Sequence, residues 1–575
     1  MTKCFLSLVF LLLVRNSIWA QQPVDYRSRT IYFAVTDRFN PQHPFHPYID
    51  PEYPDATNTS DCFTTSCPQE DQWRKYWGGD IQGVKEKLNY LDQLGVSAVW
   101  LTPLMENVRA YEGGTGYGTG YHGYWVQNYD KVNAHFGDWD DVSSLGSHLR
   151  AHGMRYMQDI TLNHSNPYDN HVFGRLFQGE NDEILVKTYQ DDFDKQNGVR
   201  AYKHYQDTQQ CKDAEKKSDA DWSYWQLHHC LLADLSGYNQ HDIRIADYLI
   251  DAGKIWMDHG VQDFRLDAVK FPFPDFISKF THEMIEHAGD INRRTPPYIV
   301  GEWSGGGVGD QRSLAFANDY DYFRTNILDF TLSLALNRFI GGSYEYSSEV
   351  FDGVMLNDLL KERVTAFEGR DTWQGTFIDN HDQIRTMVRL DKIGICSEAE
   401  RERRMDLATV LLMTVRGIPI IYYGDEQYLA NYDLYEQNGH SYSKESINAF
   451  GDDPFNRPGM KSWEEDTSAF QIIKILAALR KASPAIWKGA YIPLYASADV
   501  LVFERKEQND CVLVAVNRGG AKDITVPSGC GLAPGRQYGL LERANKNNQK
   551  SYVDINSGSS YIHLGELSSL VLSSK

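Results

Sequence analysis

The segment Asp263-Phe264-Arg265-Leu266-Asp267-Ala268-Val269-Lys270 decides the fold of this chain. Its pattern predicts a β-strand, and Arg265 and Asp267 fall on one face of it because they are two residues apart. An arginine beside a carboxylate favours the ionised form of that carboxylate. A charged acid at the end of a buried strand is costly unless it is paired or functional. The segment alone therefore fits either a structural ion pair or a catalytic acid.

Three further segments have the same character, an apolar strand that ends in acids, amides or histidines. They are Asp159-Ile160-Thr161-Leu162-Asn163-His164, Val300-Gly301-Glu302-Trp303 and Phe377-Ile378-Asp379-Asn380-His381-Asp382. Helix-like segments separate them, and repeated strand–helix units are typical of a parallel sheet. The polar strand ends are therefore expected to meet at one edge of a common sheet.

Strand-like segments recur along most of the chain. They are Thr30–Phe39, Ser97–Pro103, Arg155–Asn163, Val261–Val269, Tyr298–Glu302, Gly375–His381 and Ile418–Tyr423. About eight strands within roughly 250 residues of core favour a closed (β/α)₈ TIM barrel, an α/β fold. An open, doubly wound sheet is the structural alternative.

Two regions depart from this alternation. Residues 165–235 are polar and irregular, which predicts an inserted domain B after the third strand. Residues 481–575 contain short alternating segments divided by Gly, Asn and Pro, which predicts a C-terminal antiparallel β-sandwich. The catalytic barrel is accordingly expected at residues 21–164 and 236–480.

Residues 1–20 match the pattern of a secretory signal peptide, with Lys3, an apolar run Phe5–Val14 and small residues up to Ala20. The mature protein is therefore expected to be secreted and extracellular, without a membrane segment after signal cleavage. Its net charge of −21 argues against nucleic acid or an anionic membrane as a partner. No feature predicts oligomerisation, so a monomer is expected.

The cysteines suit an oxidising compartment. Proximity along the chain predicts three disulfides, Cys62–Cys67, Cys211–Cys230 and Cys511–Cys530, and leaves Cys396 unpaired. Asn58-Thr59-Ser60 is a glycosylation sequon in a polar loop.

Asp267, Glu302 and Asp382 occupy strand ends, where the catalytic groups of a barrel lie. Three convergent carboxylates cannot all remain ionised without cost, so at least one pKa should be raised. Glu302 has apolar neighbours and is the expected proton donor, whereas Asp267, beside Arg265, is expected to stay ionised as a nucleophile. A retaining glycosidase needs this division, with the two carboxyl groups about 5–5.5 Å apart. Asp382 would help to stabilise the transition state.

The ordered motifs resemble the four signature regions of the α-amylase family of glycoside hydrolases (family 13), including fungal amylases and the catalytic core of cyclodextrin glucanotransferases. Asp159…Asn163-His164 resembles the first region, Arg265-x-Asp267-x-x-Lys270 the second, Glu302 the third and His381-Asp382 the fourth. Supporting matches are Tyr121-His122-Gly123-Tyr124-Trp125, Leu232-Ala233-Asp234-Leu235 and Gly417-Ile418-Pro419-Ile420-Ile421-Tyr422-Tyr423-Gly424.

The resemblance implies a role for each matching residue. Asp267 is the implied nucleophile, Glu302 the implied acid/base and Asp382 the implied transition-state stabiliser. The implied substrate-binding residues are His122, Tyr124, Trp125, His164, Arg265, Lys270, His381 and Arg457. The implied substrate is an α-glucan polysaccharide of the starch or glycogen type.

The family also carries a calcium ion between the barrel and the inserted domain, so the resemblance implies Ca²⁺ as a cofactor. Asn163 and Asp234 match its side-chain ligands, and Phe271 would supply a backbone carbonyl. Hard oxygen donors of this kind suit calcium. Asn163 alone fits a turn-capping amide equally well, and only its combination with Asp234 favours the metal. Whether a second calcium site exists near Asp37 and Asp80 is left open by the sequence.

Two departures from the family pattern bear on the reaction. Phe271 stands where the second region usually has histidine, so a side-chain contact to the leaving sugar would be lost. The segment around Asp234 is most similar to the cyclodextrin-forming branch, but Cys230 replaces the central aromatic around which that branch wraps its glucan.

Three functions therefore remain open. Cys230, and a chain too short for the two further domains of the cyclodextrin-forming branch, favour endo-hydrolysis of α-1,4-glucosidic bonds by a retaining mechanism. The alternative is transglycosylation by the same machinery. A catalytically silent binding protein of this fold is a more remote alternative, because fold does not fix function.

Overall fold

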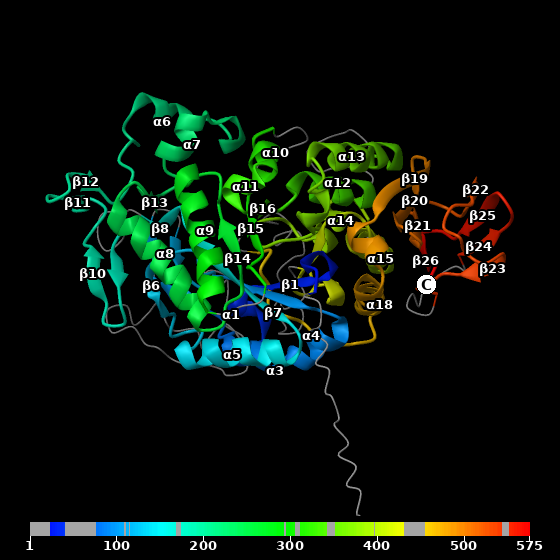
Figure 1. Cartoon of the computed structure of the whole chain (residues 1–575), viewed down its shortest axis with the longest axis horizontal. Coiled ribbons are helices and arrows are strands. Elements are labelled where there is room, and N and C mark those ends of the chain that lie inside the picture. The colour runs from blue at the N-terminus through cyan, green and yellow to red at the C-terminus, as the bar shows by residue number, and fades with distance from the viewer. Residues whose placement is uncertain are drawn as a thin grey trace, which may run out of the picture.

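The structure is a computed structural model that describes residues 24–40, 76–108, 111–113, 116–167, 174–291, 295–304, 311–341, 351–395, 397–430, 455–542 and 551–575. The predicted signal peptide, the Cys62–Cys67 pair, the Asn58 sequon and Cys396 lie outside the described residues. Figure 1 shows a central barrel with an insertion on one side and a β-sandwich on the other.

Eight parallel strands form the sheet of the barrel. They are β1 (Ile31–Ala34), β2 (Ala98–Leu101), β7 (Arg155–Thr161), β14 (Asp263–Asp267), β15 (Ile299–Gly301), β16 (Asn326–Ile327), β17 (Gly375–Phe377) and β18 (Ile418–Tyr422). Strand β1 pairs with both β2 and β18, and a parallel bridge between Leu328 and Gly375 links the end of β16 to β17. The circuit closes, so the predicted (β/α)₈ barrel is confirmed and the open sheet is wrong.

Each strand predicted from the sequence is present but shorter than its apolar pattern. Residues 30–39, for example, form β1 and then the helix α1 (Thr36–Phe39). The sequence pattern does not predict β16, because two residues are too few to show an alternation. The strands β1, β2, β7, β14 and β18 are buried along their whole length, as expected for parallel strands covered on both faces.

Helices between the strands cover the outside of the barrel (Figure 1). They are α3 (Ile81–Glu86), α4 (Leu88–Leu94), α5 (Trp139–Ala151), α8 (Ile243–Asp258), α9 (Pro274–Asp290), α10 (Gln311–Asn318), α11 (Tyr320–Phe323), α12 (Phe330–Gly341), α13 (Gly353–Ala366), α14 (Thr386–Lys392) and α15 (Glu398–Thr414). After the last strand, α18 (Ser468–Ala482) and the short α19 (Pro484–Lys488) lead into the C-terminal region. Gly95 ends α4 with φ +93°, where a Cβ would lie 2.7 Å from the Cβ of Ala477, so only glycine fits. Within the described residues, no helix has the length and apolar character needed to cross a membrane.

The segment between β7 and α8 forms most of the insertion. It contains the helices α6 (Gln209–Ala214), η3 (Asp219–Asp221) and α7 (Tyr224–His229), and the strands β8 (His164–Pro167), β9 (Leu176–Gln178), β10 (Glu183–Val186), β11 (Phe193–Asp194), β12 (Val199–Arg200) and β13 (Leu235–Gly237). Further strands beside it are β3 (Met105–Asn107), β4 (Tyr111–Gly113), β5 (Gly116–Gly118) and β6 (Val126–Val132). Strand β13 pairs with β8, which joins the two ends of the insertion beside the barrel. The domain limits named above remain predictions.

The C-terminal region consists of two antiparallel sheets. One contains β19 (Ala490–Ala496), β20 (Val500–Glu507), β21 (Asp510–Asn517) and β26 (Ser568–Ser573); the other contains β22 (Lys522–Pro527), β25 (Ser559–Leu564), β24 (Tyr552–Ile555) and β23 (Gly535–Tyr538). Val502 and Leu513 of the first sheet share a core with Ile524 and Ile562 of the second. The predicted β-sandwich is therefore confirmed. The predicted disulfides Cys211–Cys230 and Cys511–Cys530 are also present.

Candidate active site

Nine of the eleven residues predicted to be catalytic or substrate-binding line one cleft at the carboxyl ends of the barrel strands, and the other two, Arg265 and Lys270, contact residues of its lining. Asp267 ends β14, Glu302 follows β15, and Asp382 follows β17. A cavity of about 250 Å³ lies at this point. It is lined by His122, Tyr124, Trp125, His164, Asp219, Leu232, Leu235, Asp267, Ala268, Phe271, Glu302, Ser304, His381, Asp382 and Arg457.

Arg265 lies beneath the cavity and is shared by three carboxylates. Its Nη1 donates to Asp159 Oδ1 at 2.8 Å and to Asp267 Oδ1 at 2.8 Å, and its Nη2 donates to Glu302 Oε2 at 2.7 Å. The parallel pairing of β14 with β7 and β15 brings the acids of all three strands to this point. The guanidinium is 1% exposed, so these contacts are made away from bulk water.

The environment of Asp267 differs from the one expected. Burial raises the pKa of Asp267 well above its usual value; Arg265 opposes this shift, and the charges of Glu302 and Asp159 add to it. The sequence suggests that Arg265 keeps Asp267 ionised and that the raised pKa belongs to Glu302. The difference arises first because Asp267 is buried, which the sequence does not show, and second because Asp159 and Glu302 add negative charge beside it and share Arg265.

The turn after Asp267 holds Glu302 in place. Ala268 has a φ of +47°, a conformation that is costly for a residue with a Cβ. Its backbone N–H donates to Glu302 Oε2 at 3.0 Å, the same oxygen that accepts from Arg265. The two donors fix one oxygen of Glu302 and so orient the carboxyl group toward the cavity that it lines.

Aromatic and imidazole rings form one wall of the cavity. The Tyr124 hydroxyl donates to Asp159 Oδ2 at 2.9 Å, and the Tyr124 ring stacks on His381 with centroids 5.1 Å apart. His164 Nε2 donates to the Tyr124 carbonyl oxygen at 3.2 Å. Burial lowers the pKa of His122 and of His381 well below the usual range. Both imidazoles are therefore neutral and suited to hydrogen bonds with hydroxyl groups.

Asp382 stands at the open side of the cleft, with 44% of its side chain exposed. Arg457 Nη2 lies 3.2 Å from its Oδ1, and His381 Nε2 lies 3.3 Å from its Oδ2. Arg457 also donates from Nε to the His381 carbonyl oxygen at 2.9 Å. These contacts hold the carboxylate at the mouth while leaving it accessible to a ligand.

Lys270 connects the barrel to the insertion through residues that sequence reasoning missed. Its Nζ donates to the Ser304 carbonyl oxygen at 2.7 Å and pairs with Asp219 Oδ2 at 2.9 Å. Asp219 belongs to the short helix η3 and lies outside every motif. No signal in the sequence identifies it, because only the folding of the insertion brings it to the cleft.

The residues predicted to bind calcium do not fit that ion. Lys203 Nζ donates to the Phe271 carbonyl oxygen at 3.1 Å and to Asn163 Oδ1 at 3.4 Å. Asp234, the one carboxylate in the predicted set, is exposed at the surface. Calcium takes about six to eight oxygen ligands at roughly 2.3–2.6 Å, and here an ammonium group binds two of the three oxygens proposed. Burial lowers the pKa of this lysine to about 7.

The two acids considered for a second calcium are engaged in structural contacts. Asp37 pairs with Arg38, and its Oδ2 accepts from the Trp77 N–H at 2.8 Å. Asp80 caps α3 by accepting from the Gly83 N–H at 2.6 Å. Both contacts are those of structural carboxylates.

A (β/α)₈ barrel whose strand ends present three carboxylates and stacked rings in an open cleft has the architecture of a carbohydrate-active enzyme. Residues 52–476 match the sequence profile described as "Alpha amylase, catalytic domain". The chain belongs to the α-amylase family, and so to a family of enzymes that act on α-glucans.

Individual relatives include both transferases and an amylase. The cyclomaltodextrin glucanotransferase of Klebsiella oxytoca is 35% identical over 529 residues, which cover 88% of this chain and 73% of that protein. The structure of CldA, described as the first cyclomaltodextrin glucanotransferase with a three-domain ABC distribution, matches with a TM-score of 0.77 at 28% identity, over 95% of this chain and 99% of that one. An α-amylase from Geobacillus thermoleovorans has the same fold, with a TM-score of 0.68 at 22% identity, over 95% of this chain and 98% of that one.

The comparison with CldA corrects one step of the sequence argument. A chain without two further C-terminal domains is one of the two grounds on which the sequence favours hydrolysis. CldA is described as having three domains, and this chain covers 99% of it. A three-domain architecture is therefore compatible with a glucanotransferase, and chain length no longer favours hydrolysis.

The raised pKa of Asp267 gives a first prediction. Asp267 is the nucleophile predicted from the sequence, and a nucleophilic carboxylate reacts only when ionised, so this prediction requires kcat/KM on soluble starch to rise with pH through a midpoint well above 3.8, the ordinary value for aspartate. Asp159→Asn should move this midpoint to lower pH, because it removes a negative charge near Asp267 and releases Arg265. The matched surface substitution Asp247→Asn should leave it in place. A wild-type acid limb near 3.8 would contradict the prediction.

Proposed function

We propose that this protein is a retaining α-glucan enzyme whose main reaction transfers an α-1,4-linked glucosyl segment to a sugar acceptor. The supporting observation is an apolar wall beside the catalytic carboxylates. Leu232, Leu235, Ala268 and Phe271 line the cavity next to Asp267 and Glu302. Such a wall can pack against the face of an acceptor sugar but offers water few hydrogen-bond partners.

In the proposed first step, Asp267 attacks the anomeric carbon of the bound glucan. Glu302 gives its proton to the glycosidic oxygen, so the bond to the leaving sugar breaks and a covalent β-glucosyl ester with Asp267 forms. Arg265 contacts both carboxylates, at 2.8 and 2.7 Å, and so keeps them close together. This closeness favours a retaining mechanism over an inverting one, which needs room for a water between the two acids.

In the second step, Glu302 acts as a base. It takes the proton from the 4-hydroxyl of an acceptor sugar, whose oxygen attacks the anomeric carbon and releases Asp267, so the α configuration is restored. If the acceptor is water, the same step is hydrolysis. The outcome therefore depends on which molecule occupies the space beside the partly exposed Leu232 and Leu235.

The remaining residues would bind the sugar on either side of the scissile bond. We assign Asp382, oriented by Arg457, to hydrogen bonds with the ring that is attacked, and Lys270 to the leaving-group side. His122, His164 and His381 would contact hydroxyl groups of the attacked ring, while Tyr124 and Trp125 would pack against it.

Hydrolysis is the second candidate, and a specific observation favours it. Cys230 stands where the cyclodextrin-forming branch has an aromatic ring, and it is disulfide-bonded and 2% exposed. It offers no ring around which a glucan could wrap. The absence of that ring disfavours cyclisation and so favours hydrolysis relative to it, and the transfer that we propose should go mainly to linear acceptors, with cyclic products as a minor fraction.

A time course of maltohexaose digestion, with products separated by size, tests this second prediction. We expect early linear products longer than the substrate, in amounts that rise when glucose or maltose is added as acceptor. Glu302→Gln should form the same products at least about 10²-fold more slowly, which controls for contaminating enzymes. If all products are shorter than the substrate and new reducing ends appear from the start, the main reaction is hydrolysis and the proposed transfer is wrong. No product from the wild type would favour the silent binding protein.

We also propose that the protein is exported, as a monomer and with sugar on Asn58. The disulfides Cys211–Cys230 and Cys511–Cys530 support an oxidising compartment. Mass spectrometry of the secreted protein would show the loss of residues 1–20 and the added mass of the glycan on Asn58, and size-exclusion chromatography would show whether it is a monomer.

A further inference from the structure

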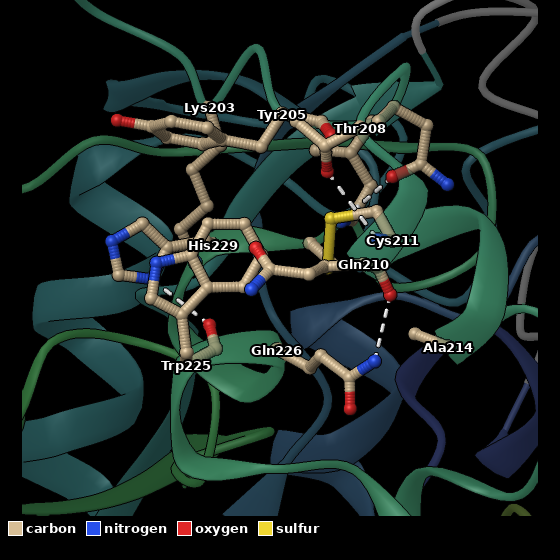
Figure 2. The surroundings of a disulfide bond; sticks show 12 residues. Lys203, Tyr205, Thr208, Gln210, Cys211, Ala214, Trp225, Gln226 and His229 are labelled. Carbon is tan, nitrogen blue, oxygen red and sulfur yellow. Dashed lines mark hydrogen bonds between the residues drawn. A yellow bond between two sulfur atoms is a disulfide. The ribbon is translucent and has the colours of Figure 1, made fainter.

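Lys203 occupies a fixed place in the insertion. Its backbone N–H donates to the Gly237 carbonyl oxygen at 2.8 Å, and its own carbonyl oxygen accepts from the Tyr189 hydroxyl at 2.6 Å. The residue is 1% exposed. Figure 2 shows Lys203 among the residues around the Cys211–Cys230 disulfide, which fixes the neighbouring part of the insertion. The side chain therefore extends into the protein from an anchored backbone.

The ammonium group reaches the barrel from this position. It donates to the carbonyl oxygen of Phe271 at 3.1 Å and to Oδ1 of Asn163 at 3.4 Å, and it lies 5.6 Å from the centroid of the Phe273 ring. Phe271 follows β14, and Asn163 follows β7. One side chain thus joins the insertion to the ends of two adjacent barrel strands.

We infer that the Lys203 ammonium replaces the metal ion that relatives of this family place between barrel and insertion, and that this protein keeps its insertion docked without calcium. A cation at this point gathers oxygen atoms from separate segments, which an ammonium does with three N–H donors. A calcium ion in addition would place a second positive charge against the same oxygens.

The chemistry of the oxygens agrees with a single positive charge. The two hydrogen-bond acceptors of Nζ within the described residues are a backbone carbonyl and a side-chain amide, both neutral. Calcium sites in proteins usually include carboxylates that offset the double charge. Asp234, which would have supplied one, is exposed at the surface. An ammonium carries one positive charge where calcium carries two, so neutral oxygens can bind it without a carboxylate among them.

The first test measures the wild-type protein. After dialysis without chelator, metal analysis should find far less than one calcium per chain. The Tm should differ by no more than about 1 °C between excess EGTA and excess calcium, because a ligand that does not bind the folded state does not stabilise it. Stoichiometric calcium that EGTA removes, with a fall in Tm, would overturn the inference. These readouts do not depend on which reaction the enzyme catalyses.

The second test removes the charge. Lys203→Met keeps the length of the side chain but leaves the Phe271 and Asn163 oxygens without their donor, so the Tm should fall by about 3 °C or more. The control Lys216→Met alters an exposed lysine of the same insertion, which pairs with Asp213 at 2.8 Å on the surface, and should not change the Tm. An unchanged Tm for Lys203→Met would contradict the inference. If Lys203→Met fails to fold, the calcium content of the wild-type protein and its Tm in EGTA still show whether the insertion docks without calcium.

Discussion

Replacing Glu302 with Gln should lower the rate of starch conversion by about 10²–10⁴-fold, the usual contribution of a general acid. Replacing Asp267 with Asn should lower it by about 10⁴-fold or more, because no covalent intermediate can then form. The two carboxylates share Arg265, so starch activity alone does not separate their roles. A substrate that needs no proton donor does separate them.

An α-glucosyl or α-maltosyl fluoride is such a substrate, because fluoride leaves without being protonated. With this substrate Glu302→Gln should still form the ester with Asp267, and added azide should then attack it and give an α-glycosyl azide. In Asp267→Asn, azide can take the place of the missing nucleophile and attack directly, which gives the β-glycosyl azide. Opposite product configurations would therefore identify which residue is the acid and which is the nucleophile.

The matched control is Glu283→Gln, a partly exposed carboxylate on α9 that pairs with Lys254 at 2.7 Å. It should leave both starch conversion and fluoride release unchanged. The same azide anomer from both active-site variants, or fluoride release by Asp267→Asn without azide at the wild-type rate, would contradict the assignment.

Contacts that are local in sequence could be predicted from it. Arg265 and Asp267 are two residues apart on β14, and their ion pair follows from the geometry of a strand. The barrel could be predicted for a similar reason, because each buried strand carries its own apolar run. Two-residue β16 carries none, and only the closure of the sheet reveals it.

Contacts that depend on the register between distant strands could not be predicted. Arg265 contacts Asp159, 106 residues away in sequence, and Glu302, 37 residues away. The negative charges of these two acids contribute to the raised pKa of the buried Asp267. Lys203 meets the Phe271 carbonyl across 68 residues. A single lysine in a polar insertion gives no sign that it is buried, so the sequence favoured a metal where the structure has an ammonium.

Arg265→Met is the substitution expected to destabilise the protein most. It leaves Asp159, Asp267 and Glu302 without the cation that all three now contact. Removing one partner of a buried ion pair costs about 3–5 kcal/mol in the free energy of unfolding. Chemical denaturation at neutral pH, followed by fluorescence, measures this loss. The control Arg536→Met breaks the exposed pair with Asp554 in the β-sandwich and should have little effect.

The pH dependence of this loss tests whether Arg265 stabilises the protein as a counter-charge. Without Arg265, burial and mutual repulsion should raise the folded-state pKa of these carboxyls above their unfolded-state values. Groups of that kind contribute stability below the unfolded-state pKa and lose it as pH rises through the folded-state pKa, so the variant should be closest to wild type in acid and weakest at neutral pH. Adding Asp159→Asn should restore part of the loss, since one buried anion is then absent. Equal destabilisation at all pH values would mean that Arg265 acts through packing alone. It would then not act as the shared counter-charge that positions the nucleophile and the acid.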